Sequence, residues 1–264
     1  MQGNQEVVIG KRYGLKEMVA HNLHMLTCVI LIISGLYMMK QFNICAADSW
    51  GFISYDPLRL IHIVVAILFL LLNWVLIPYN LITSGHIFQY IFSPKDVIRL
   101  KDAFVGIFNK EQYPKYTIYN KTTGHYENAL HPMVKLLVIF EGMAIVLIAL
   151  TGLIMIDLNF VIIHFNIPLW NDLMTWLVED VIGFFAAFIN MTGVQLVRSV
   201  HLWATYWFVI ELIFHLGFLF IDPRTGKYFK AMFLTGKEEM DEYTEVTEGG
   251  HEEKKEKHPI IVFR

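Results

Sequence analysis

The stretch RSVHLWATYWFVIELIFHLGFLFID, from Arg198 to Asp222, gives the clearest indication of how this chain folds. After Arg198 it is largely apolar over the length of a bilayer crossing, yet it carries His201, Glu211 and His215. A helix turns about 100° and rises about 1.5 Å per residue, so the fourteen-residue gap between the histidines spans about 1400° and about 21 Å. Both imidazoles therefore point in one direction, one near each end of the span. Two metal centres stacked across a membrane could each take one axial nitrogen from such a helix.

The composition indicates a membrane protein. Hydrophobic residues make up 55% of the 264 residues and charged residues only 17%, which is too apolar for an ordinary soluble domain. The formal net charge is −3 and no basic cluster alternates with aromatic residues, so we expect no nucleic-acid partner. Residues 1–20 carry charges as far as Glu17 and show no cleavage site, so the first span is expected to act as its own insertion signal.

The two cysteines exclude several kinds of metal site. Cys28 lies inside an apolar run and Cys45 lies beyond it, so the pair cannot supply the four thiolates of an iron-sulfur cluster. The sequence also contains no C-x-x-C-H motif for covalent haem attachment. Any metal in this chain is therefore expected to be held by histidine.

Four apolar runs are long enough to cross a bilayer, at residues 21–39, 60–77, 133–156 and 200–221. They predict an all-α integral membrane protein, with a four-helix bundle formed within residues 1–235.

Lysine and arginine are distributed on one side of this bundle. They occur at 11–16, 95–121 and 224–237, and they are absent from 41–58 and 157–197. Because basic connections stay in the cytoplasm, we expect both termini on the cytoplasmic side of the inner membrane.

Two segments extend beyond a plain four-span bundle. The stretch LWNDLMTWLVEDVIGFF, residues 169–185, has a polar stripe through Asp172 and Glu179 and predicts an amphipathic helix lying in the outer interface. A fifth span is the alternative, but it would place one terminus outside, against the charge bias. Residues 236–264 have too little apolar content to bury, and we expect a disordered or partner-dependent cytoplasmic tail.

Four of the eleven histidines lie where a bundle can use them. His62 and His201 lie at the outer ends of their spans, whereas His21 and His215 lie at the inner ends. Depth alone pairs His62 with His201 and His21 with His215. We therefore interpret the chain as a di-haem cytochrome whose four histidines ligate two haems. His24 shares a helix face with His21 and is the alternative ligand on the first span.

Glycines and arginines accompany these histidines. Gly35 lies fourteen residues after His21, so the face that offers an imidazole inside offers a gap outside, where a porphyrin edge could pass. Gly152 could do the same on the third span, and close helix packing is the alternative for both glycines. Arg59 and Arg198, at the outer ends of the ligand helices, could pair with haem propionates or could simply anchor those ends.

These motifs resemble those of the di-haem cytochrome b subunits that anchor nickel-iron hydrogenases and formate dehydrogenases in the membrane. The resemblance covers about residues 10–235, and the ligand spacing of the last span is its most specific part. The matching stretches are HNLHMLTCVILIISGLYM (21–38), RLIHIVV (59–65), ALTGLIM (149–155) and RSVHLWATYWFVIELIFH (198–215).

The resemblance implies an electron-transfer subunit whose chemistry belongs to two haem b groups. Its partners would be an iron-sulfur subunit and a catalytic dehydrogenase subunit on the outer face, and a quinone, expected to be menaquinone, inside the membrane. The extended 157–197 connection and the acidic tail depart from the family and leave the partner open between hydrogenase and formate dehydrogenase.

The formate dehydrogenase branch also implies a quinone position. There the quinone approaches the inner haem beside an asparagine just before the third span, and the matching stretch here is HYENALHPMVK, residues 125–135. Asn128 and His131 are thus candidate quinone contacts. A helix-start asparagine and an inner-surface histidine are the alternatives.

Glu141 and Glu211 lie inside spans, where an isolated carboxylate is costly. They could carry protons toward a reduced quinone, or they could stay protonated and bond to a neighbour. Two other functions remain open. The electrons could run the other way, from quinol to an outward-facing thiosulfate or polysulfide reductase. The chain could instead be a haem-free transport subunit whose histidines and glutamates form a proton path.

Overall fold

A computed structural model describes residues 9–39, 55–106, 108, 113–159, 168–221, 225–240 and 244–247. Four of its helices are long and apolar enough to cross a membrane: Leu15–Met38, Tyr55–Ser84, Pro132–Ile156 and Gly193–Gly217. These helices correspond to the four predicted spans, and each helix is longer than the apolar run from which it was predicted. The prediction of a four-span helical bundle is confirmed.

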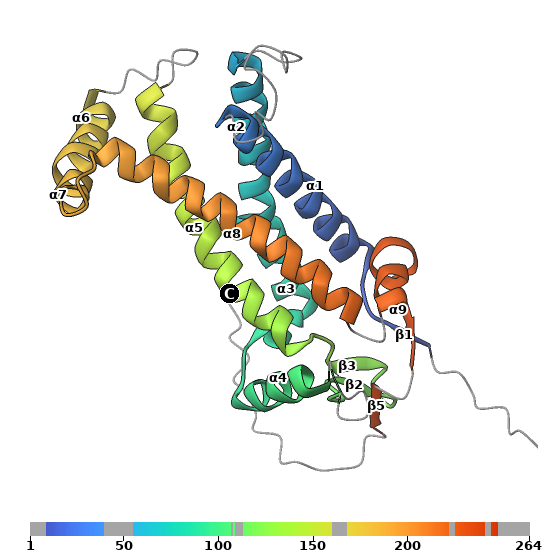
Figure 1. Cartoon of the computed structure of the whole chain (residues 1–264). Coiled ribbons are helices and arrows are strands. Elements are labelled where there is room, and N and C mark those ends of the chain that lie inside the picture. Colours follow the sequence, from blue (N-terminus) through green and yellow to red (C-terminus); the bar gives the residue numbers. More distant parts are fainter. Residues whose placement is uncertain are drawn as a thin grey trace, which may run out of the picture.

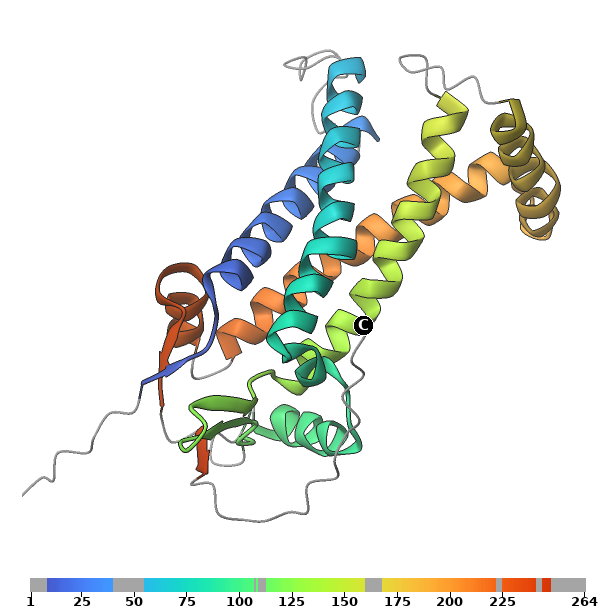
Figure 2. The same ribbon diagram turned by 180° about the vertical axis from the view of Figure 1, so that it is seen from behind.

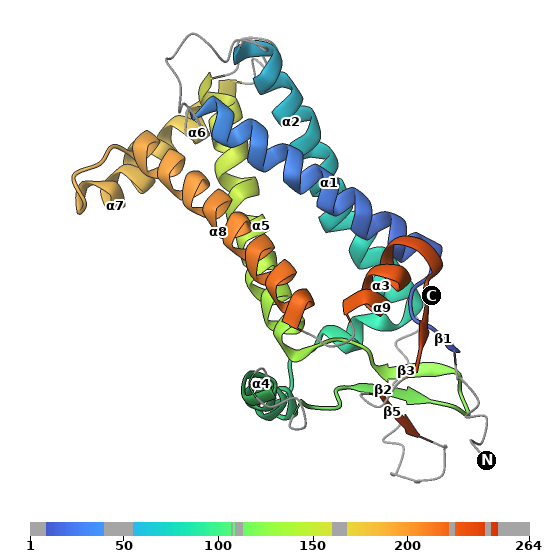
Figure 3. The same cartoon turned by 45° about the vertical axis from the view of Figure 1, so that its right-hand side comes forward.

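The spans pack as two pairs of helices. The first pair is α1 (Leu15–Met38) with α2 (Tyr55–Leu71), and the second is α5 (Pro132–Asn159) with α8 (Gly193–Ile221), as Figure 1 shows. Figure 3 shows α1 and α2 on one side of the bundle and α5 and α8 on the other, with α8 also reaching α1.

A cluster of buried apolar side chains joins the two pairs at mid-height. Phe69 of α2 and Phe208 of α8 meet edge to face, with ring centroids 6.1 Å apart, and Ala144 and Ile145 of α5 complete the cluster. Phe208 lies seven residues from each histidine of α8. The cluster therefore separates the outer histidine level from the inner one.

The second span changes its helical winding near its C-terminal end. After α2 the chain makes one π-helical stretch, η1 (Leu72–Leu76), and continues as α3 (Ile77–Ser84). Pro78 lacks the N–H that an α-helix would donate to the carbonyl of Trp74, and the wider turn precedes this residue directly. The π-helical stretch carries Asn73, whose amide Nδ2 donates to the Phe69 carbonyl at 2.8 Å.

Short elements gather at one end of the bundle, and we call them together the cap (Figures 1 and 2). Between α3 and α5 they are η2 (His86–Tyr90), α4 (Pro94–Gly106), β2 (Thr117–Asn120) and β3 (His125–Asn128). The chain termini add β1 (Ile9–Lys11), α9 (Thr225–Lys230), η5 (Ala231–Thr235), β4 (Lys237–Glu239) and β5 (Thr244–Thr247).

Strands from distant parts of the sequence pair within the cap. β1 pairs antiparallel with β4, while β2 pairs antiparallel with β3 and parallel with β5. We expected residues 236–264 to form a disordered or partner-dependent tail, and β4 and β5 of this segment pair with other strands of the chain. They are ordered by strand pairing rather than by an apolar core. Residues 241–243 and 248–264 lie outside the described part of the chain.

A buried arginine holds the two ends of the cap together. The guanidinium of Arg12 bonds to the carboxylate of Glu238 and to the carbonyl of Ala129, and its Cζ lies 4.4 Å from the ring centroid of Tyr228. Burial opposes the charge, but Tyr13, Tyr228 and Glu238 outweigh it, and the pKa of Arg12 is raised above its ordinary value. The guanidinium therefore stays charged.

A second buried ion pair ties the cap to the third span. The Lys135 ammonium of α5 lies 3.1 Å from Oδ2 of Asp96 in α4, and Ser93 donates to the same carboxylate through its N–H and its hydroxyl, both at 2.8 Å. Burial would raise the pKa of Asp96, but the Ser93 hydrogen bonds and the Lys135 charge prevail, so this pKa is lowered.

The amphipathic segment forms a helix at the opposite end of the bundle. It runs through α6 (Pro168–Trp176), π-helical η4 (Leu177–Ile182) and α7 (Gly183–Ala187) and packs against the start of α8. Gly193 permits this contact, because a Cβ there would stand 1.8 Å from the Val178 carbonyl oxygen. The predicted helix is confirmed, and it is not one of the candidate spans found in the described residues. Its place in the membrane interface remains a prediction.

Candidate functional site: two histidine pairs

His62 of α2 faces a serine and a glycine of α1. The Oγ of Ser34 lies 2.7 Å from the imidazole Nδ1 of His62, and both side chains are largely buried. A Cβ added at Gly35 would stand 3.4 Å from His62 Cε1. The ring therefore lies close to the α1 backbone at Gly35, where a larger side chain would press on it.

His201 of α8 is placed in the same way by α5. The Oγ1 of Thr151 lies 2.9 Å from His201 Nδ1, and a Cβ at Gly152 would stand 3.5 Å from His201 Cε1. In each helix pair, one helix carries a hydroxyl residue followed by a glycine, and the imidazole of the other helix packs against these two residues. The rings of His62 and His201 also lie near enough to interact electrostatically.

His21 of α1 and His215 of α8 face each other at the cap end of the bundle. Their ring centroids are 6.5 Å apart and their planes are inclined by 39°. A metal bound about 2 Å from each imidazole nitrogen separates two such rings by about 6 Å, so the spacing suits one metal between them. Nδ1 of His21 is buried without a hydrogen-bond partner among the described residues.

His24 is engaged elsewhere. Its Nδ1 lies 3.0 Å from Oδ1 of Asn73 in η1, and its Nε2 lies 3.0 Å from Oε1 of Glu141 in α5. Both ring nitrogens therefore have protein partners. This arrangement supports His21 over His24 as the first-span ligand, and the choice stays a prediction.

The two carboxylates inside the membrane belong to the same polar group. Glu141 contacts His24, and its side chain also lies near that of Glu211 of α8. Neither carboxylate is therefore isolated within its span. A role of Glu141 and Glu211 in proton transfer stays a prediction.

The chain's residues fit b-type haem at both levels. The donor set is imidazole alone, the two glycines leave gaps beside the outer rings, and the inner rings stand at the spacing of a shared metal. His62 and His201 would hold one haem, and His21 and His215 the other.

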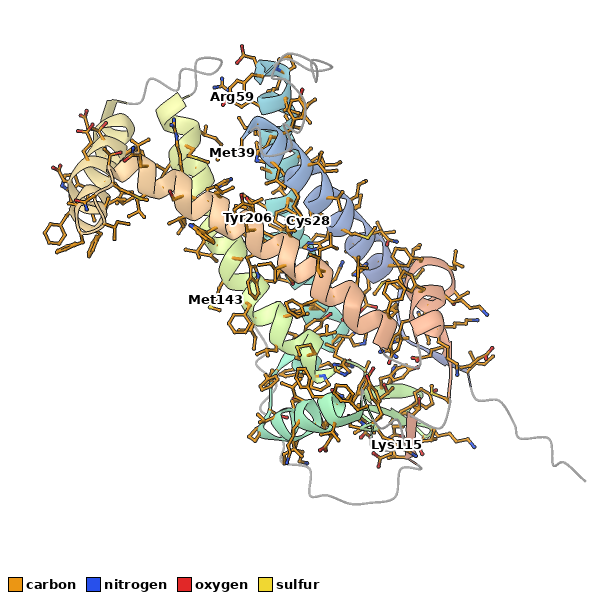
Figure 4. The ribbon with its side chains drawn as sticks, in the orientation of Figure 1. Cys28, Met39, Arg59, Lys115, Met143 and Tyr206 are labelled. Carbon is orange, nitrogen blue, oxygen red and sulfur yellow. The ribbon has the colours of Figure 1, made fainter. Side chains whose placement is uncertain are left out.

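The two arginines lie at the end of the bundle away from the cap. Figure 4 shows Arg59 at that end of α2 and Lys115 beside the cap strands. The Cζ of Arg59 lies 5.8 Å from the ring centroid of Tyr55, while Arg198 is exposed one turn before His201. Both positions are compatible with propionate contacts and with anchoring, so the propionate role stays a prediction.

Asn128 and His131 make contacts within the cap. The Nδ2 of buried Asn128 donates to the carbonyl of Tyr116 at 2.6 Å and to that of Leu130 at 3.3 Å. His131 Nδ1 accepts the backbone N–H of Met133 at 3.0 Å, and so caps the start of α5. These contacts support the structural interpretation of both residues. A quinone contact by either one is still only predicted.

Sequence reasoning missed three residues of the site, namely Ser34, Thr151 and Asn73. Ser34 and Thr151 could have been found from the sequence, because each of these hydroxyl residues directly precedes a candidate haem-gap glycine, Gly35 or Gly152. Asn73 carried another, since an asparagine interrupts an otherwise apolar span.

Comparison with known proteins identifies the family. The model of prokaryotic cytochrome b561 matches residues 12–234. The F420 non-reducing hydrogenase II cytochrome subunit of Methanosarcina mazei is 35% identical over 248 residues, which cover 90% of this chain and 86% of that protein. No solved structure matches. The chain therefore belongs to the prokaryotic cytochrome b561 family and is a multi-pass, di-haem b-type membrane cytochrome.

Proposed function

We propose that this chain is the membrane-anchoring cytochrome b subunit of a hydrogenase complex, and that it connects a catalytic partner on the outer face with a quinone in the membrane. The observation that carries the proposal is the presence of two histidine pairs at two depths of one bundle. The printed name of the Methanosarcina mazei relative, a hydrogenase cytochrome subunit, supports the choice of partner.

The residues of the chain place and orient the redox groups. His62, packed against α1, and His201, packed against α5, lie near enough to interact electrostatically, and His21 and His215 face each other near the cap. When bound, the haems supply one-electron iron couples at these two levels, which allows electrons to cross the hydrocarbon. The Phe69 and Phe208 cluster keeps water out of the space between the levels.

The polar group around His24 supplies protons on the cap side. Reduction of a quinone consumes protons, and the neighbouring carboxyl groups of Glu141 and Glu211, beside His24, offer a route for them. With the cap in the cytoplasm, as the basic residues indicate, uptake through this group would come from the cytoplasmic side. The α6–α7 helix then lies on the outer side, where an iron-sulfur partner would dock.

The test combines a spectrum with identification of the partner. The protein, purified in mild detergent from its native membranes, should show b-type bands in a reduced-minus-oxidised spectrum and should co-purify with a nickel-iron subunit. A molybdenum-containing partner would instead point to formate dehydrogenase. Absence of b-type bands would end the cytochrome proposal and favour a haem-free proton path.

The direction of flow needs a separate measurement. Membrane vesicles supplied with hydrogen should reduce the haems, and added quinone should reoxidise them. Reduction by quinol, with no response to hydrogen, would favour an outward-facing terminal reductase.

A further inference from the structure

We propose that Ser34 and Thr151 are positioning residues for the outer haem, and that they fix the ligating tautomer of His62 and His201 and lower the reduction potential of that haem. The inference rests on the proposed ligand pair His62 and His201. Its new element is that two hydroxyls, one from each helix pair, set the electronic state of the ligands.

The first step concerns the acceptor to which each hydroxyl donates its hydrogen bond. Ser34 Oγ donates to the carbonyl of Ile30 at 2.7 Å, and Thr151 Oγ1 donates to the carbonyl of Leu147 at 2.7 Å. A carbonyl oxygen can only accept, and a hydroxyl has one proton. With that proton directed at the helix backbone, each hydroxyl oxygen is left as an acceptor.

The second step follows for the imidazoles. Ser34 Oγ lies 2.7 Å from His62 Nδ1 and Thr151 Oγ1 lies 2.9 Å from His201 Nδ1. With both hydroxyl protons on the backbone, each Nδ1 carries the proton of this bond and donates it. A neutral imidazole with its proton on Nδ1 has its free lone pair on Nε2. Both rings are thus held in the tautomer that ligates iron through Nε2.

The third step concerns the iron. An imidazole that donates a hydrogen bond from Nδ1 becomes a stronger electron donor through Nε2, because the bond raises the basicity of the ligand. Stronger donation favours ferric over ferrous iron and lowers the potential. The inner pair differs, since Nδ1 of His21 is buried without such a partner among the described residues. The two haems should therefore have unequal potentials, with the outer one lower.

Ser34→Ala and Thr151→Ala, alone and together, test this proposal. A redox titration of the purified cytochrome, followed optically, should show an upward shift of one haem potential in each single variant and a larger shift in the double variant. The low-spin ferric signal of the same haem should move in electron paramagnetic resonance. The other haem should keep its potential.

Two sets of controls separate positioning from packing. Ser34→Thr and Thr151→Ser keep an acceptor at each site and should retain the original potential and signal. Thr27→Ala removes a buried hydroxyl from α1 that bonds back to Leu23 and His24 in the same way, and it should shift neither haem. An equal shift in Thr27→Ala would overturn the proposal.

Failure of the inference differs from failure of the proposed function. A double variant that retains both haems with unchanged potentials and signals would overturn the hydroxyl role while leaving the cytochrome intact. A wild-type protein without b-type haem would overturn the proposed function itself. If the alanine variants lose the outer haem, its retention in the Ser34→Thr and Thr151→Ser proteins supports positioning, and its loss there refutes it.

Discussion

The outer pair, His62 and His201, and the inner pair, His21 and His215, are held by the same helix bundle in different surroundings. Each outer ring rests against a glycine and has its Nδ1 on a hydroxyl. The inner rings face each other at 6.5 Å, beside a group of ionisable side chains that includes Glu141.

This difference suggests a division of tasks between the two levels. The outer rings are fixed by neutral hydrogen bonds, which suits a site that exchanges electrons with a docked protein. The inner rings lie near groups that can take up protons, which suits a site where electron and proton transfer meet. The following experiments test this difference between the two levels.

Removal of a ligand should have the largest effect. His201→Ala should abolish the outer haem and keep the inner one, and His215→Ala should do the reverse, because each level depends on its own pair. Haem content per protein, measured as the pyridine haemochrome, should fall by half in each variant. His125→Ala, at an exposed position in β3, should keep both haems. Full haem content in both ligand variants would mean that other residues hold the iron.

Filling the outer gap should act on one level only. Gly152→Leu would place a side chain beside His201, where a Cβ alone already comes within 3.5 Å of the ring, and it should remove nearly all of the outer haem. Gly142→Leu is the matched control, since a Cβ there meets nothing within 4 Å. Spectra of the two proteins should differ by the outer haem alone. Equal haem loss in both would show that bulk on α5, rather than the gap, is responsible.

Breaking the ion pair between cap and bundle should affect the inner level first. Lys135→Met leaves Arg99, 3.7 Å from Oδ1, as the remaining cation beside the buried Asp96 carboxylate, so the loss of folding free energy should stay below the about 3–5 kcal/mol of a fully unpaired buried charge. Thermal release of haem, followed by absorbance in detergent, should then begin at a lower temperature and with the inner haem. Lys115→Met, at an exposed cap position, should leave the transition unchanged. Earlier release of the outer haem would contradict the link between cap and inner level.

Acid should remove the same stabilisation. The pKa of Asp96 is lowered in the folded protein, so its contribution is complete above the ordinary carboxyl pKa of about 4 and disappears as the pH falls through the lowered value. The difference in melting temperature between the wild type and Asp96→Asn should be constant near neutral pH and should shrink in acid. A difference that grew in acid would show that Asp96 is not the group responsible.

The smallest effect is expected at His24. His24→Ala should retain both haems, because both nitrogens of this ring are bonded to Asn73 and Glu141. His21→Ala, three residues earlier on the same face, should lose the inner haem. Haem spectra of the two variants compare them directly. The opposite result would exchange the roles of the two histidines.

The sequence predicted the parts of the molecule that follow local rules. Hydropathy located the four spans, and the spacing of His201 and His215 set two levels because a regular helix fixes their relative direction. The amphipathic stripe through Asp172 and Glu179 correctly indicated a helix.

The parts that escaped prediction depend on contacts between distant segments. β1 and β4 are short and lie at opposite ends of the chain, so neither shows a strand pattern of its own. Ser34 and Thr151 bond back to their own helices, as hydroxyls in membrane helices commonly do, and only the packed structure shows an imidazole on the other side. The contact of Asn73 with His24 likewise could not be predicted, because Asn73 lies in a π-helical stretch that only the structure shows.

The pairing of β1 with β4 bears on how the protein is made. The ribosome synthesises β1 before the first span, but β4 emerges only after the fourth. The ion pair between Arg12 and Glu238 can therefore form only after all four spans have been synthesised. A chain truncated before β4 would leave the buried Arg12 guanidinium without its carboxylate partner.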